Sequence, residues 1–170
     1  MMTSPLAFVD TETTGLDARI HQPYEVCIWR EDWDKPFTYG LPHDLQHADS
    51  QALAIGRYWE RKRQWKQGDH TTVRVVADSL RGATLVGSNP AFDAAMLTRL
   101  IGTPVWHHRM VDVGTIAMVT FGLDRPIGLA EVRTRLVDIG YDIPAPDHTA
   151  EGDVRTTRAA YEALRSIGGA

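Results

Sequence analysis

Cysteine and long apolar runs are nearly missing from this 170-residue sequence. The one cysteine, Cys27, excludes an intramolecular disulfide and a cysteine-based zinc site, and it favours a reducing, cytoplasmic setting. No apolar run approaches the ~20 residues that a membrane-spanning helix needs. Residues 1–5 have neither the basic region nor the apolar stretch of a secretory signal. We therefore expect an intracellular protein with no membrane partner.

An excess of positive charge is also missing. The chain has 22 acidic and 18 basic residues, which gives a net charge of −4. This balance excludes a protein that coats nucleic acid by bulk basicity, so any affinity for a polyanion must be local. Hydrophobic residues make up 43% of the chain, as in ordinary globular proteins. Because there is no repeat or linker, residues 1–170 are expected to form a single domain.

Short apolar runs and turn residues predict the order of strands and helices. The predicted strands cover residues 6–9, 24–29, 37–41, 83–86 and 105–111, with a hairpin-like turn over 31–36. The predicted helices cover residues 49–65, 73–81, 90–101, 113–121, 129–139 and 150–167. Three strands come first, and strands then alternate with helices. This order favours an α/β protein with a mixed sheet and helices on both faces.

Two carboxylates end the first predicted strand. Asp10 and Glu12 are two residues apart, which places both side chains on one face of a strand. They repel each other unless a cation lies between them, and a hard divalent cation such as Mg²⁺ prefers oxygen ligands. A solvated strand end is the alternative explanation. The carboxyl end of a buried strand, however, is where open α/β sheets place their ligands.

Two further acids and a histidine stand near predicted helix starts. Asp93 follows Asn89–Pro90, where Asn suits the N-cap and Pro the first helical position. Asp153 lies in the first turns of the last helix, and by itself each acid fits stabilisation by the helix dipole, worth ~0.3–1 kcal/mol. His148 and Asp153 cannot share a helix face, so both reach one site only if His148 lies in the preceding loop. A loop histidine can serve as a general base, and a surface histidine is the alternative.

Three segments together resemble a known family. They are DTETTGLD at 10–17, NPAFD at 89–93 and HTAEGD at 148–153. Their order and spacing are similar to the signature segments of the DEDDh (DnaQ-like) 3′–5′ exonucleases. This family includes the proofreading subunit of bacterial replicative polymerases, ribonuclease T and oligoribonuclease. The resemblance spans about residues 6–165 and favours a functional role for the acids and the histidine over the structural alternatives.

The resemblance implies a ribonuclease H-like fold with a five-stranded mixed sheet. It implies hydrolysis of DNA or RNA from the 3′ end, with release of nucleoside 5′-monophosphates. Asp10, Glu12, Asp93 and Asp153 would hold two divalent cations, Mg²⁺ or Mn²⁺, and His148 would deprotonate the attacking water. Two such cations can lower the pKa of water and neutralise charge on the leaving oxygen, so the physical chemistry agrees with the resemblance.

The same resemblance implies that Thr13, Leu16 and Phe92 contact the terminal nucleotide. The expected partner is the 3′ end of a single-stranded nucleic acid, and the proofreading relatives also allow a polymerase or another replication protein. The alternative is a non-hydrolytic nucleic-acid-binding or polymerase-accessory module with the same fold. All five catalytic residue types are present, which argues against that alternative because degenerate modules usually lose some.

One strongly basic stretch has no counterpart in the resemblance, because residues 41–72 align with nothing in it. The sequence RYWERKRQWK at 57–66 interleaves basic and aromatic residues, a composition that suits a single strand of nucleic acid. On one continuous helix, Ile55, Tyr58 and Trp59 would form an apolar stripe that packs on the core. We expect this stripe to pack while Arg57, Arg61 and Arg63 face solvent.

Overall fold

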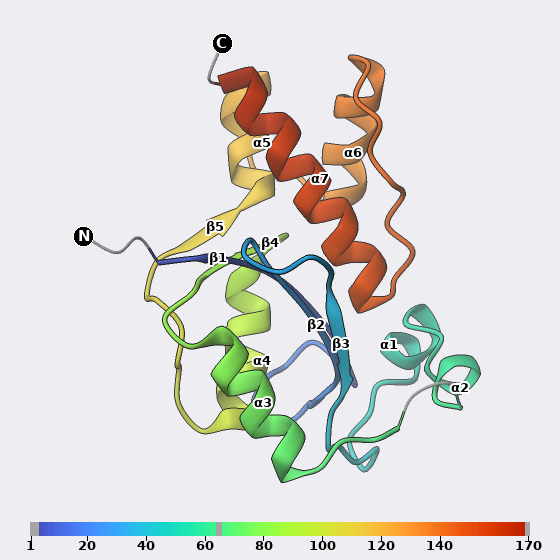
Figure 1. Ribbon diagram of the computed structural model, residues 1–170. Coiled ribbons are helices and arrows are strands. Elements are labelled where there is room, and N and C mark those ends of the chain that lie inside the picture. The colour runs from blue at the N-terminus through green and yellow to red at the C-terminus, as the bar shows by residue number, and fades with distance from the viewer. Residues whose placement is uncertain (1–3, 64–65, 169–170) are drawn as a thin grey trace.

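One five-stranded sheet organises the protein (Figure 1), and its strand order is β3-β2-β1-β4-β5. The computed structural model describes residues 4–63 and 66–168. The strands are β1 (Leu6–Thr13), β2 (Pro23–Arg30), β3 (Phe37–Gly40), β4 (Thr84–Gly87) and β5 (Met110–Asp112). β1, β2 and β3 pair antiparallel, and β4 and β5 continue the sheet in parallel from β1. The predicted hairpin and mixed sheet are therefore confirmed.

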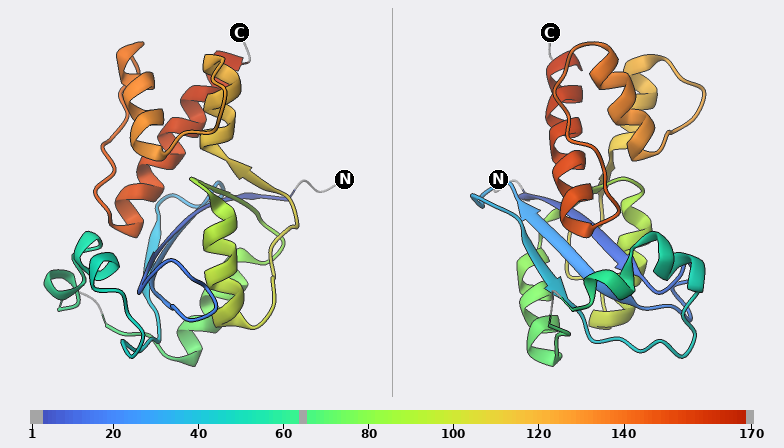
Figure 2. Two further views of the ribbon diagram at one scale, coloured as in Figure 1. Left: turned by 180° about the vertical axis from the view of Figure 1, so that it is seen from behind. Right: turned by 90° about the vertical axis from the view of Figure 1, so that its right-hand side faces the viewer.

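Helices cover both faces of the sheet, as predicted. The helices are α1 (Ser50–Ile55), α2 (Tyr58–Arg61), α3 (His70–Leu80), α4 (Pro90–Ile101), α5 (Val113–Phe121), α6 (Leu129–Asp138) and α7 (Ala150–Gly168). α3 and α4 pack on one face, while α5, α6 and α7 pack on the other (Figures 1 and 2). In the described part of the chain, no helix is both long and apolar enough to span a membrane.

The alternation along β1 decides which side chains face which helical layer. Ala7 and Val9 belong to the core under α3 and α4, whereas Phe8 belongs to the core under α7. Because side chains alternate along a strand, Asp10 and Glu12 continue the row of Phe8 toward the α7 side. The strand runs on to Thr13, four residues beyond the predicted apolar run. The carboxylates are therefore part of β1 rather than of the loop after it.

Two predicted elements differ from the observed ones. The predicted helix over 49–65 is broken into α1 and α2 at Gly56–Arg57, where Arg57 has a left-handed φ of 48°; its last two residues, Gln64 and Trp65, lie outside the described residues. The predicted strand over 105–111 is reduced to β5, because the chain before it makes only isolated bonds, such as His107 N–H to the carbonyl of Ala83. Trp106 instead packs into the core under α3 and α4.

Candidate active site

The two carboxylates of β1, Asp10 and Glu12, lie beside residues of the neighbouring antiparallel strand β2. Asp10 pairs across the strands with Cys27, and Glu12 pairs with Glu25. Asp10 has a pKa raised well above its ordinary value, first by burial and then by repulsion from Asp93, Asp153 and the other nearby carboxylates. Burial also raises the pKa of Glu12 to about 8, although Arg61 opposes this shift. Both carboxyl groups therefore resist ionisation. A bound cation would relieve the repulsion between their negative charges and favour the ionised forms.

Asp93 reaches β1 from the first turn of α4. Its Oδ1 accepts hydrogen bonds from the backbone N–H of Thr11 at 2.9 Å and from the Thr11 hydroxyl at 2.7 Å. The side chain is buried, and burial raises its pKa to about 7 despite these two hydrogen bonds. Asn89 is the N-cap residue and Pro90 begins the helix, as predicted, but Asn89 has a left-handed φ of 61° and its side chain makes no capping bond. Asp93 is thus held by the strand that carries Asp10.

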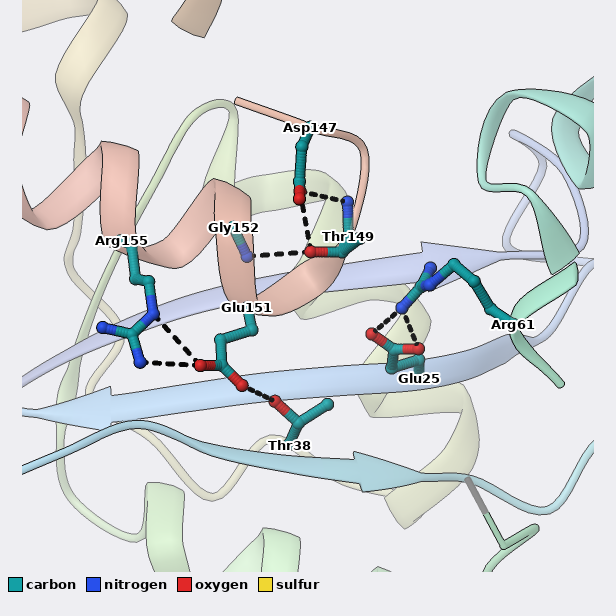
Figure 3. A pocket seen from close by; sticks show the side chains of 8 residues that line it. All are labelled: Glu25, Thr38, Arg61, Asp147, Thr149, Glu151, Gly152 and Arg155. Carbon is teal, nitrogen blue, oxygen red and sulfur yellow. Dashed lines mark hydrogen bonds and ion pairs between the residues drawn. The ribbon is translucent and has the colours of Figure 1, made fainter. Parts of the chain in front are cut away.

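The loop before α7 places His148 next to Asp153, as the spacing requires. Asp153 Oδ1 accepts the backbone N–H groups of Asp147 at 3.1 Å and His148 at 3.3 Å. Asp147 in turn accepts bonds from the N–H and hydroxyl of Thr149 (Figure 3). His148 has a left-handed φ of 57°. Burial raises the pKa of Asp153, and the two backbone bonds and His148 oppose that shift. One carboxylate therefore shapes the loop that carries the histidine.

A cavity of about 220 Å³ collects nearly all the predicted residues. Seven of the eight line it, namely Asp10, Glu12, Thr13, Leu16, Phe92, His148 and Asp153. Asp93 does not line it and lies behind Thr11, to which it is hydrogen-bonded. Within the described residues, no three acidic, histidine or cysteine side chains are close enough to form a ready metal cage. The acids gather at the carboxyl end of β1, the central strand, but they do not surround one common position at which a metal ion would bind.

Sequence reasoning missed the wall of this cavity that α1 provides. Ala52 and Ile55 line it together with Leu16 and Phe92, so the cavity has apolar side chains as well as carboxylates in its wall. Ile55 is 52% exposed, and Leu16 is 80% exposed. The predicted apolar stripe is therefore wrong for Ile55, which borders the cavity instead of packing on the core. The glycine at position 56 is the one sequence signal for a helix break after Ile55, and the predicted continuous helix over 49–65 did not take it into account.

Gly56, in the turn between α1 and α2, lies directly against the side chains of Tyr24 and Glu12. A Cβ atom at this position would lie 2.1 Å from the Tyr24 hydroxyl and 2.8 Å from Glu12 Oε2. The Tyr24 hydroxyl itself donates to Glu12 Oε2 at 3.5 Å. Tyr24 is fully buried and packs edge-to-face on Tyr58, with ring centroids 4.9 Å apart. The turn between α1 and α2 is therefore in contact with the residues that position Glu12.

Arg61 anchors this turn from the other side, in a second and larger cavity of about 480 Å³ (Figure 3). Its Nη2 donates to both carboxylate oxygens of Glu25 at 2.5 Å, and its Nη1 donates to the carbonyl of Gly56 at 3.1 Å. The two side chains are only 12% and 2% exposed. The prediction that Arg61 faces solvent is wrong, because a buried carboxylate 36 residues away takes it as a partner.

The larger cavity is polar, but its charged groups already pair with one another. Arg155 pairs with Glu151 at 2.7 Å, and Glu151 also accepts a hydrogen bond from Thr38 at 3.2 Å (Figure 3). With Arg61 bound to Glu25, both arginines among the residues that line this cavity have carboxylate partners. It therefore offers little to a phosphate, and its residues serve to fix the elements around the smaller cavity.

The strand order and the helices on both faces define a ribonuclease H-like α/β fold. No family model and no curated protein sequence matches the chain. Solved structures of exonuclease I do match it in fold.

A zinc-bound E. coli exonuclease I–single-stranded DNA complex superposes with a TM-score of 0.73 and 17% identity, over 97% of this chain and 41% of that one. A product-bound exonuclease I gives 0.72 and 16%, over 97% and 44%. The enzyme from Methylocaldum szegediense gives 0.71 and 19%, over 96% and 41%. The chain thus spans less than half the length of these proteins, and the likeness concerns the fold.

Proposed function

We propose that this chain is a metal-dependent 3′–5′ exonuclease. It hydrolyses phosphodiester bonds from the 3′ end of single-stranded DNA or RNA and releases nucleoside 5′-monophosphates. The observation that carries the proposal is the cavity in which Asp10, Glu12, Asp153 and His148 lie together at the carboxyl end of β1, the central strand of the sheet. The fold shared with exonuclease I, which is described in complex with single-stranded DNA, supports the same activity.

The acids fit a pair of divalent cations, Mg²⁺ or Mn²⁺. Asp10, Glu12, Asp93 and Asp153 would hold them, since all four offer carboxylate oxygens and all four have pKa values raised first by burial. Such a pair of cations would activate a water and neutralise charge on the leaving oxygen. Asp93 does not line the cavity, because it is buried and hydrogen-bonded to Thr11. It would therefore bind a cation through a water molecule or after a small shift of α4.

The remaining residues have roles that their positions suit. His148 would accept the proton of the attacking water, because its loop borders the cavity and its backbone is fixed by Asp153. Leu16 and Phe92 would enclose the terminal nucleotide, and Thr13, which follows Glu12 on β1 and also lines the cavity, would contact it as well. Ile55 adds an apolar wall from α1. This arrangement leaves the 3′-terminal phosphodiester facing the acids.

The test is digestion of 5′-labelled single-stranded DNA and RNA of equal sequence with Mg²⁺. We expect a ladder that shortens from the 3′ end, with no activity in EDTA and strong slowing by a 3′-terminal phosphorothioate. His148→Gln should lose ~10²-fold or more in rate, the usual contribution of a general base. It should still bind Mn²⁺, because the carboxylates remain.

Three results would contradict the proposal or its details. Binding of oligonucleotides without hydrolysis would favour the non-hydrolytic module instead. Efficient cutting of closed circles would exclude a pure exonuclease. Loss of Mn²⁺ binding in His148→Gln would make His148 a ligand. A polymerase or another replication protein as a partner stays a prediction, which co-purification with the full chain would test.

A further inference from the structure

The exposed side of α1 and α2 combines features that the carboxylate site does not use. Trp59 is 58% exposed, which is unusual for so large an apolar side chain. The Lys62 ammonium lies 4.7 Å from the centre of the Trp59 ring. Arg57 and Arg63 are also exposed. The predicted packing of Trp59 on the core is therefore wrong, because the break at Gly56 turns it outward while Tyr58 turns inward.

The cations of this surface are not neutralised by a carboxylate of the described residues. None of Arg57, Lys62 and Arg63 forms an ion pair with another residue that the structure describes. This separates them from Arg61, which Glu25 holds in the interior. The exposed residues of 57–63 carry three positive charges against the single negative charge of Glu60. In a chain of net charge −4, this is a local positive surface.

The surface begins at the rim of the carboxylate cavity. Ile55 lines the cavity, Gly56 touches the Tyr24–Glu12 pair, and Arg57 follows immediately. Arg57 takes a left-handed φ of 48°, a conformation that a residue with a side chain adopts at an energetic cost. α1 and α2 also lie beside the N-terminal end of α7 in each view (Figures 1 and 2). A strand with its 3′ end in the cavity would therefore meet this surface as it leaves.

We propose that Arg57, Trp59, Lys62 and Arg63 form a binding surface for the single-stranded nucleic acid upstream of the two 3′-terminal nucleotides. We call these four residues the α2 surface. Cations follow the phosphates and an exposed ring stacks on a base, which is how proteins bind single strands without reading sequence. Lys62 sits over Trp59 and can reach a phosphate next to the stacked base. The inference rests on the proposed function for the polarity of the strand.

Binding and turnover are measured separately, so that this inference and the proposed function can fail independently. Binding of labelled dT20 and U20 is followed by anisotropy in EDTA over a range of salt concentrations. Turnover is followed with Mg²⁺ on a 20-mer and on a dinucleotide, which is too short to reach the α2 surface. The variants are Arg57→Gln/Lys62→Gln/Arg63→Gln, Trp59→Ala and Trp59→Phe. The matched control is Arg125→Gln, an exposed arginine of the α5–α6 connection, a segment that lies at the other end of the molecule from α2 (Figure 2).

We expect the triple variant to weaken binding at least about tenfold at low salt. Its log–log salt dependence should flatten by about 2, since each lost contact to a single-strand phosphate removes ~0.7. Trp59→Ala should lose about tenfold with little change in salt dependence, and Trp59→Phe should keep most of the affinity because it can still stack. KM on the 20-mer should rise in parallel, while turnover of the dinucleotide and the melting temperature stay unchanged.

Several outcomes would overturn the inference. These are an unchanged salt dependence in the triple variant, an equal loss in Arg125→Gln, an equal loss on 20-mer and dinucleotide, or no binding of either oligonucleotide by the unmodified protein. Loss on U20 alone or dT20 alone would assign the surface to one kind of strand. Hydrolysis from the 3′ end with no role for Trp59 would sink the inference and leave the proposed function standing. Trp59-dependent binding without hydrolysis would do the reverse.

Discussion

The two sides of the carboxylate cavity are built in different ways. The acidic side comes from β1, α4 and α7, which are long regular elements rooted in the sheet and its cores. The other side comes from α1, a helix of 6 residues that lines the cavity with Ala52 and Ile55 and is followed, after a break, by the 4-residue α2. The acidic side is held by burial and by hydrogen bonds between packed regular elements, such as the bond from the Thr11 hydroxyl on β1 to Asp93 on α4. The α1–α2 side is held to β2 by a few side-chain contacts, such as that of Arg61 with Glu25.

Under the proposed function, this difference separates the demands of catalysis on the acidic side from those of strand binding on the α1–α2 side. Groups that share cations must hold their mutual geometry closely, which regular elements on a packed scaffold provide. A surface that follows a flexible polymer needs exposed cations and rings, and α1 and α2 pack on a small separate core of Tyr24, Leu53 and Tyr58 that leaves such side chains outside. Arg61 and Tyr58 connect the two sides, since Arg61 binds Glu25 and Tyr58 packs on Tyr24. The predictions below disturb one side at a time.

Removing one acid should have the largest effect, and it should lower activity without lowering stability. Asp10→Asn is expected to reduce hydrolysis at least about 10²–10³-fold, the loss typical of removing one electrostatic stabiliser of a transition state. The same change relieves repulsion among buried carboxylates, so the metal-free variant should melt at a higher temperature. Single-turnover assays and thermal unfolding in EDTA measure the two effects.

Asp93 provides the contrast within the acidic side. Asp93→Asn retains an oxygen that can accept both bonds from Thr11, whereas Asp93→Ala leaves a buried N–H and hydroxyl without their acceptor. The alanine variant should therefore be less stable than the asparagine variant by about 1–3 kcal/mol. Near-normal turnover in Asp10→Asn or in Asp93→Asn would mean that the catalytic centre lies elsewhere.

The same contrast explains what the sequence could predict. The acids of β1 and α7 follow a short apolar run and a helix start, and local pattern is enough to place them. Asp93 was placed on the correct helix, but its burial behind Thr11 depends on how α4 packs on β1. The positions of Arg61 and Trp59 depend on a left-handed residue and on Glu25, far away along the chain. Helical periodicity carries no information on either, so both were predicted on the wrong side.

The ion pair that anchors α2 gives the next largest effect, and this one should fall on stability. Arg61→Met leaves Glu25 buried without a partner next to Glu12, which typically reduces the free energy of unfolding by about 3–5 kcal/mol. Combining it with Glu25→Gln removes the stranded charge and should recover much of the loss. Urea unfolding of the three variants forms a double-mutant cycle.

The control for that cycle is an exposed pair of similar geometry. Arg135 and Glu131 pair at 2.8 Å on α6, and their side chains are 38% and 51% exposed. Arg135→Met should change the free energy of unfolding by only ~0.3–0.5 kcal/mol, as for other helical surface pairs. A similar loss in Arg61→Met and Arg135→Met would show that the buried pair does not hold α2 in place.

Contact between the two sides can be tested with a single methyl group. Gly56→Ala adds a Cβ that would overlap the Tyr24 hydroxyl and crowd Glu12, so the turn or the carboxylate must shift. The expected loss of stability is about 1–3 kcal/mol, with a fall in kcat because Glu12 moves. Gly128→Ala is the matched control, since its φ of −73° is close to the −74° of Gly56 and its Cβ meets nothing within 4 Å. Equal behaviour of the two variants would argue against the close approach.

The smallest expected effect is a pH dependence of the metal-free protein. The pKa of Glu12 is raised from its ordinary 4.5 to about 8, and that of Asp93 is raised from 3.8 to about 7. The folded protein thus holds protons that the unfolded chain has already released, so stability should fall as pH rises from about 4 to about 8 and then level off.

The seven histidines titrate in part of this range, so the measured quantity is the difference between the unmodified protein and Asp10→Asn. In EDTA, we expect the melting temperature of the unmodified protein to fall by a few degrees more than that of Asp10→Asn over this pH range. This estimate takes a shift of ~2–4 °C for each kcal/mol of unfolding free energy. Mn²⁺ should reverse the decline at pH 8 and do little at pH 5, where it must displace protons first. Parallel curves for the two proteins, with no response to Mn²⁺ at pH 8, would mean that these acids neither repel one another nor bind a cation.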